Sequence, residues 1–160
     1  MMNDEHLIDR LKEKYKDHDT TNFNVFDFLH AFGSGFEALF YSMLFWPEFI
    51  EIDDMIFLKG TIENDEDRQR LTDTFEKYGK DRFATEKDFN CIEISYLFGP
   101  RTAESTEEED LWLAERLVEM WRCRLQVLYP KRNFVVNVLD PRETNNEVAI
   151  LFFQKDDTKD

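Results

Sequence analysis

The sequence is poor in the residues that form linkers or cross-links. Its 160 residues include only 5 Gly, 4 Pro and 2 Cys. So few chain breakers exclude a long flexible linker, and this length suits one hydrophobic core. We therefore predict a single α+β domain over residues 1–155 and a disordered polar tail over 156–160. Cys91 and Cys123 can form at most one disulfide, whereas small secreted domains use several, so we expect a reducing, cytoplasmic location.

Basic side chains are also scarce, with 20 Lys and Arg against 35 Asp and Glu and a formal net charge of −15. A field of this sign repels phosphate groups and anionic lipid headgroups, so we predict no direct binding to nucleic acid or membrane. No apolar run reaches the roughly 20 residues that a membrane span requires. The longest, Phe36 to Trp46, contains Glu37 and Ser42. The first residues are acidic where a signal peptide is basic, which argues against export.

Aromatic residues, in contrast, are abundant: they make up 15% of the chain and include 16 Phe, which excludes a disordered acidic chain. Apolar residues at helical spacing predict helices, and runs of β-branched and aromatic residues predict strands. The predicted helices are 4–16, 24–32, 36–45, 65–78 and 106–129, and the predicted strands are 49–52, 55–58, 91–98, 134–139 and 147–154, with a polar loop before residue 91. This order predicts an α+β fold: a mainly antiparallel five-stranded sheet, ββ-α-β-α-ββ, with two N-terminal helices packed on it.

Several element boundaries carry specific signals. Asn64 is a predicted helix N-cap, Thr106 and Glu109 form a Thr-x-x-Glu capping box, and Asp53-Asp54 separates two strands as a hairpin turn. On the helix that follows Thr106, the spacing of the apolar residues places Trp121 in the core together with Leu117, Val118, Leu125 and Leu128.

One segment formally fits a nucleotide-binding motif. Gly33-Ser34-Gly35-Phe36-Glu37-Ala38 matches the Gly-x-Gly-x-x-Ala form of the dinucleotide fingerprint, and Asp53 follows where such sites place an acid that binds ribose. The fingerprint requires a preceding strand and a doubly wound sheet, whereas residues 25–32 have helical spacing. We interpret the glycines as a helix kink or a close backbone approach, and we predict no cofactor.

No set of residues has the spacing of a metal or catalytic site. His30 lacks the His-x-x-x-His or Cys-x-x-Cys spacing of a zinc site, and both cysteines are predicted to be buried, inert thiols. Glu51 and Asp53 share a strand face, which alone is weak evidence for paired carboxylates, and residues 64–67 lack the Gly and Glu of a calcium loop. We predict no catalytic residue and no metal, and we favour a non-enzymatic protein while leaving enzymatic activity open.

The negative charge is concentrated in two segments, 48–67 and 104–119, with net charges of −7 and −6. If the hairpin turn and the helix start lie on the same side, they form one acidic face that attracts a basic partner. The predicted partner-binding residues are Glu51, Asp53, Asp54, Glu107, Glu108, Glu109 and Asp110. The alternative is that acids at a helix start complement the helix dipole and surface acids keep the protein in solution.

Half of the 16 Phe residues lie between residues 23 and 49, which predicts that this segment is covered. Because residues 36–45 are apolar on all sides, we expect a central core helix, with a subunit interface or a ligand pocket as the alternatives. The pocket would be lined by Phe26, His30, Phe36 and Phe40.

Two functional hypotheses from different classes follow. The first is a non-enzymatic acidic interaction domain, such as an inhibitor or immunity-type protein that neutralises a basic toxin or nuclease. The second is a small-molecule-binding or enzymatic domain that uses the Phe-rich pocket. A homodimer is a third expectation. We favour the first hypothesis because the charge is concentrated in two segments and no catalytic or metal-binding spacing is present.

Overall fold

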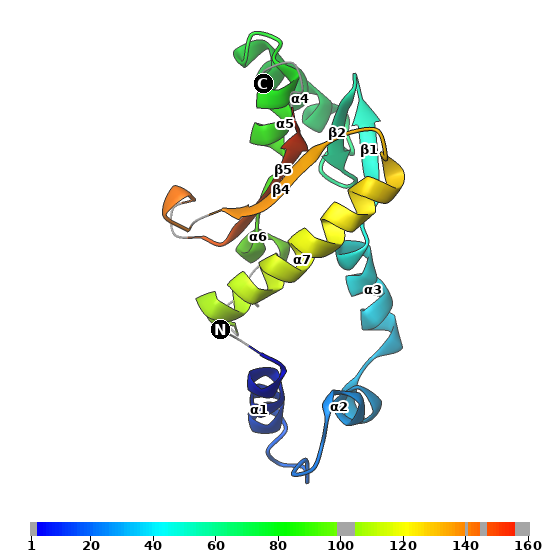
Figure 1. Ribbon diagram of the computed structural model, residues 1–160, viewed down its shortest axis with the longest axis vertical. Helices are drawn as coiled ribbons and strands as arrows, with labels where there is room; N and C mark the ends of the chain where they lie inside the picture. Colours follow the sequence, from blue (N-terminus) through cyan, green and yellow to red (C-terminus); the bar gives the residue numbers. More distant parts are fainter. Residues whose placement is uncertain (1–2, 99–104, 140, 145–146, 156–160) are drawn as a thin grey trace. The chain divides into compact units, whose positions relative to one another are not determined.

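The computed structural model describes residues 3–98, 105–139, 141–144 and 147–155 (Figure 1). The predicted turn at Gly99-Pro100 and the predicted tail over 156–160 lie outside these residues. The contacts between residues divide the chain into two compact units, residues 1–43 and 44–160, here called unit 1 and unit 2. Each unit is described by itself.

Unit 1 contains α1 (Asp4–Lys14), α2 (Val25–Phe32) and most of α3 (Gly35–Phe45). Asn24 caps α2 through a capping box with Asp27, because each side chain accepts a hydrogen bond from the other residue's backbone N–H. Phe28, which is 4% exposed, is the buried residue of α2. Four aromatic rings form the small core of this unit: Tyr15, Phe23, Phe28 and Phe32.

The prediction that α3 is the central core helix is wrong for the part of α3 in unit 1. Every residue from 35 to 43 is exposed, including Phe36 at 81% and Met43 at 72%. Only Leu44 and Phe45, at the end of the helix, pack against the main core of unit 2. An apolar sequence indicates that a helix requires covering, but it does not identify the surface that covers it.

Unit 2 begins with a hairpin of β1 (Phe49–Ile52) and β2 (Met55–Leu58), whose bounds confirm the prediction. Asp53 and Asp54 have φ values of 50° and 64°, as both central residues of a two-residue type I′ turn require. Asp tolerates this left-handed region better than most residues, which explains why the pair separates the two strands. The turn fixes the register so that Ile52 pairs with Met55.

The next part of unit 2 differs from the prediction in two places. After α4 (Asp65–Lys77), the predicted polar loop contains α5 (Arg82–Phe89), which Asp81 caps by accepting hydrogen bonds from two backbone N–H groups. The predicted strand 91–98 is β3 (Cys91–Glu93) followed by α6 (Ile94–Phe98). Such a short apolar run fits both a strand and a helical turn, so its periodicity alone does not decide between them.

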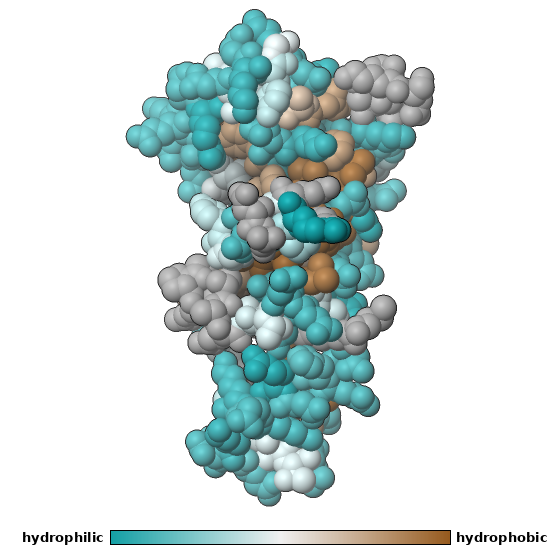
Figure 2. All heavy atoms as spheres, turned by 90° about the vertical axis from the view of Figure 1, so that its left-hand side faces the viewer, coloured by the Kyte–Doolittle hydropathy of each residue, from teal (hydrophilic) through white to brown (hydrophobic). Residues whose placement is uncertain are grey.

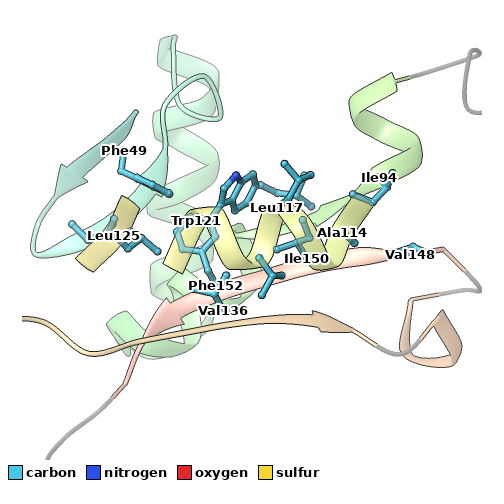
Figure 3. Close-up of a cluster of buried hydrophobic side chains, with 13 residues drawn as sticks. Phe49, Ile94, Ala114, Leu117, Trp121, Leu125, Val136, Val148, Ile150 and Phe152 are labelled. Carbon is cyan, nitrogen blue, oxygen red and sulfur yellow. The ribbon is translucent and has the colours of Figure 1, made fainter. Parts of the chain in front are cut away.

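A long helix and a three-stranded sheet complete unit 2. The helix is α7 (Glu107–Leu128), with the predicted Thr106–Glu109 capping box. β4 (Phe134–Leu139), a short 3₁₀ helix (Pro141–Glu143) and β5 (Ala149–Gln154) follow. β5 lies between β3 and β4 and is antiparallel to both. One face of α7 packs on this sheet, and the predicted core residue Trp121 lies at the centre of the cluster with no exposed surface (Figure 3).

The mixture of helices and antiparallel strands confirms the α+β class, but the prediction of one five-stranded sheet is wrong. The described strands form a two-stranded sheet, β1–β2, and a separate three-stranded sheet, β3–β5–β4. Alternate residues of β2 join different clusters: Ile56 belongs to the main core, whereas Met55 and Phe57 pack with Ile62 and Leu71. At the edge of β2 away from β1, the backbone N–H and C=O of Ile56 bond to the side chains of Glu86 on α5 and of its C-cap Asn90.

Candidate functional site

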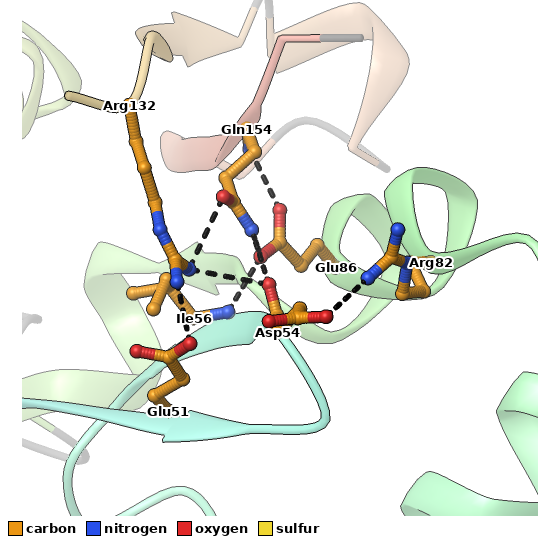
Figure 4. Close-up of polar contacts among 7 residues, drawn as sticks. All are labelled: Glu51, Asp54, Ile56, Arg82, Glu86, Arg132 and Gln154. Carbon is orange, nitrogen blue, oxygen red and sulfur yellow. Dashed lines mark hydrogen bonds and ion pairs between the residues drawn. The ribbon is translucent and has the colours of Figure 1, made fainter.

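Three polar residues in and next to α5 are almost completely buried: Thr85 and Asn90 are 0% exposed, and Glu86, which carries a carboxylate, is 1% exposed. The Glu86 carboxylate has the most hydrogen bonds to other elements. It accepts hydrogen bonds from the backbone N–H of Ile56 on β2 at 2.5 Å and of Gln154 on β5 at 2.7 Å. The side-chain amide of Gln154 donates a third at 2.6 Å (Figure 4). One side chain therefore connects the two sheets through backbone groups that lack strand partners there.

Asn90, one helical turn after Glu86, has a related role. Its Nδ2 donates to the carbonyl oxygen of Ile56 at 2.8 Å, and its backbone oxygen accepts a hydrogen bond from Phe152 N–H at 3.3 Å. The Glu86 side chain therefore bonds to the N–H of Ile56, and the Asn90 side chain bonds to the C=O of the same residue. We call Glu86 and Asn90 the α5 clamp.

Burial is the main cause that raises the pKa of Glu86 above the ordinary range of glutamate, although the three donors and the charge of Arg132 act in the opposite direction. A raised pKa often marks a catalytic acid, but the carboxylate has almost no exposed surface and its oxygens already bond to the protein's own donors. The arrangement is that of a structural connection. Sequence reasoning missed it because a single Glu in a polar segment carries no local signal.

Two of the three predicted acids of the hairpin, Glu51 and Asp54, form ion pairs with arginines near Glu86 (Figure 4). Arg132 bonds to Glu51 Oε1 at 2.5 Å and to the carbonyl oxygen of Asp54 at 3.3 Å. Arg82 pairs with the Asp54 carboxylate at 2.7 Å. The negative potential at this end of unit 2 is therefore weaker than the net charge of −7 over residues 48–67 suggests. Asp53 is exposed in the turn.

The remaining predicted acids lie in the first turn of α7. Glu109 completes the capping box by accepting from Thr106 N–H at 2.8 Å, and Asp110 accepts from the hydroxyl of Ser105 at 2.6 Å. Glu107 and Glu108 are exposed. All four acids lie where the helix dipole favours negative charge, so part of their role is structural.

The structure does not bring the two predicted acidic groups together. Arg132, four residues beyond the end of α7, contacts Glu51, whereas Glu107 begins the helix. A helix of 22 residues is about 33 Å long at 1.5 Å per residue. The hairpin therefore lies near one end of α7 and the acidic first turn lies at the other, as Figure 1 shows.

The outer surface of α7 continues the acidic region of its first turn. Glu108, Glu115 and Glu119 are exposed, and their spacing of seven and four residues places them on one side of the helix. Leu111, 37% exposed, and the half-buried Trp112 lie beside them, with the Arg116 guanidinium 5.4 Å from the Trp112 ring. We call the group Glu108, Leu111, Trp112, Glu115 and Glu119 the α7 outer face. The partner-binding residues predicted from the sequence include Glu108 and omit the other four, although the helical spacing of these residues is visible in the sequence.

The side chains predicted to line a pocket are on the surface instead. Phe26, His30, Phe36 and Phe40 are all exposed, with Phe26 at 80% and Phe40 at 65%. Two hollows among the described residues, one along α4 and one bordered by β3 and α6, contain none of these four side chains.

The dinucleotide-like motif also lacks the required context, since α2 precedes it in place of a strand. A Cβ added to Gly33 would lie 2.4 Å from the carbonyl oxygen of Leu29. This supports the interpretation of Gly33 as a close backbone approach at the end of α2.

Cys91 and Cys123 are free, but both residues are exposed, so the prediction that they are buried is wrong. Partial burial of the Cys91 thiol, followed by the charges of Glu93 and Asp88, raises its pKa, which disfavours the reactive thiolate. Among the described residues, no group of three or more His, Cys, Asp or Glu side chains is arranged to hold a metal ion. No helix in the described part of the chain combines the length and apolar character of a membrane span.

On the face of the molecule in Figure 2, hydrophilic side chains predominate and hydrophobic ones gather in a limited area. Comparison of the chain with family models, curated proteins and solved structures finds no match.

Proposed function

We propose that this protein is a non-enzymatic interaction domain that binds a basic protein, in the manner of an inhibitor or immunity-type protein, through the α7 outer face. The observation that carries the proposal is the combination of three exposed glutamates with Leu111 and Trp112 on one helix surface. Aromatic residues supply much of the affinity at protein interfaces, whereas charges on the rim steer the encounter. The net charge of −15 adds a long-range attraction for a basic partner.

Reversing the charge of the α7 outer face is expected to slow association with the partner by about tenfold or more at low salt, because rim charges act mainly on the encounter rate. The test variant carries Glu108→Lys, Glu115→Lys and Glu119→Lys. Proteins captured on the immobilised wild type at low and high salt are compared quantitatively with those captured on the variant, and the association rate of each captured basic protein is then measured.

The matched control carries the same charge change on another exposed helix of unit 2, with Glu66→Lys, Asp73→Lys and Glu76→Lys on α4. A partner that recognises the α7 outer face binds this control at nearly the wild-type rate. A third variant, Asp53→Asn, tests the hairpin turn. If the α4 and α7 variants weaken binding equally, only the net charge matters, and if neither does, the acids serve solubility and the proposal is wrong.

A further inference from the structure

The most exposed hydrophobic surface described in unit 1 lies on α3. Phe36, Leu39, Phe40 and Met43 are 81%, 68%, 65% and 72% exposed. They occupy positions i, i+3, i+4 and i+7, so they form one stripe along two turns of the helix. The opposite side of the helix carries Glu37, Ala38, Tyr41 and Ser42. We call the four-residue stripe the α3 apolar face.

The α3 apolar face is large enough for a small subunit interface. With about 150–250 Å² for an aromatic side chain and a value near the lower end for Leu and Met, the four exposed side chains present about 500 Å² of apolar surface. Two copies that pair through this face would bury about 1,000 Å² in total, the size at which specific interfaces begin.

The charges around α3 favour a second copy of the chain as the occupant. Between residues 28 and 47, Glu37 is the only Asp, Glu, Lys or Arg, and interface cores are depleted of charge in the same way. A helix that binds a lipid surface carries Lys or Arg on its polar side, whereas the polar side of α3 carries Glu37. Two acidic chains repel each other, so a contact between them requires an uncharged surface of this kind.

We propose that the α3 apolar face is a homodimer interface in which α3 of one copy packs antiparallel against α3 of the other. The four positions are symmetric about the midpoint between Leu39 and Phe40. A twofold axis through this midpoint places Phe36 opposite Met43 of the second copy and brings the two central pairs together. The surface therefore matches itself, as a twofold interface requires. This proposal is independent of the α7 outer face.

The first test places a charge at the centre of the interface. Leu39→Glu is expected to weaken self-association by about thirtyfold or more, since it buries an unpaired charge at a position typical of a hot spot. Ala38→Glu is the matched control, because it adds the same charge to the exposed opposite side of the same helix. Sedimentation equilibrium over a range of concentrations measures the dissociation constant, and circular dichroism checks the fold of each variant.

The second test remains informative if a charged variant fails to fold. In a chain with Cys91→Ser and Cys123→Ser, Leu39→Cys is expected to form a covalent dimer with a short bis-maleimide cross-linker, and Ala38→Cys is not. The Glu108→Lys, Glu115→Lys, Glu119→Lys variant is expected to dimerise like the wild type. A wild-type chain that stays monomeric at every concentration overturns the proposal, and so does equal behaviour of the residue 38 and residue 39 variants.

Discussion

Replacing Trp121 by alanine is expected to lower the free energy of unfolding by about 3–5 kcal/mol, the usual cost of removing a large core side chain. Trp121 has no exposed surface and forms edge-to-face contacts with Phe49 and Phe152 at centroid distances of 6.4 and 5.9 Å. Its indole N–H also donates to the carbonyl oxygen of Leu44 at 2.8 Å. Denaturation in urea, followed by circular dichroism, measures the loss.

Two further variants separate the contributions of packing and hydrogen bonding. Trp121→Phe keeps an aromatic ring but removes the donor to Leu44, so we expect a loss of about 1–2 kcal/mol. Trp112→Ala is the control on the same helix: this ring is only half-buried, and we expect a loss of about 1 kcal/mol or less. A loss below about 1 kcal/mol for Trp121→Ala would contradict the central role of this side chain in the core.

The features that the sequence predicted well depend on neighbouring residues. The Thr106–Glu109 capping box and the Asn64 cap each require groups three residues apart, and both are present. The Asp53-Asp54 turn is equally local, since two consecutive residues set its backbone angles. Trp121, Leu117, Val118 and Leu125 were assigned to the core correctly because helical periodicity marks one face of α7. The same prediction is wrong for Leu128, the last residue of α7, which is 38% exposed.

The features that the sequence did not predict depend on residues far apart in the chain. Glu86 joins backbone groups 30 and 68 residues away, and these bonds occupy edges that a continuous sheet would need for pairing. Nothing near Glu86 distinguishes it from the other acids of its segment. Pairing strands that follow one another in the sequence therefore did not predict the division into two sheets.

The candidate site was predicted only in part for the same reason. Charge counting located the acidic first turn of α7 but did not show that Arg132 and Arg82 compensate Glu51 and Asp54. These pairs join residues 81 and 28 positions apart. The apolar sequence of α3 likewise predicted that this helix is covered, but the residues of one helix do not identify the surface that covers it.

Replacing Glu86 by alanine is expected to lower the free energy of unfolding by about 3–5 kcal/mol, because the backbone N–H groups of Ile56 and Gln154 lose their acceptor while buried. Glu86→Gln keeps the shape of the side chain and one acceptor oxygen, so we expect a smaller loss. Glu76→Ala is the control, since Glu76 is exposed on α4 and forms a surface ion pair with Lys80 at 3.3 Å. That variant should stay within about 0.5 kcal/mol of the wild type in chemical denaturation.

The raised pKa of Glu86 gives the loss in Glu86→Gln a definite dependence on pH. An acid whose pKa is higher in the folded state holds its proton more tightly there, so its contribution to stability is complete below the unfolded pKa of about 4.3. That contribution declines as pH rises through the folded pKa. Because glutamine does not titrate, the wild type should lose stability relative to Glu86→Gln as pH rises from about 4 through the folded pKa of Glu86. A wild-type advantage over Glu86→Gln that grows with pH would show that the hydrogen bonds to the carboxylate outweigh its burial.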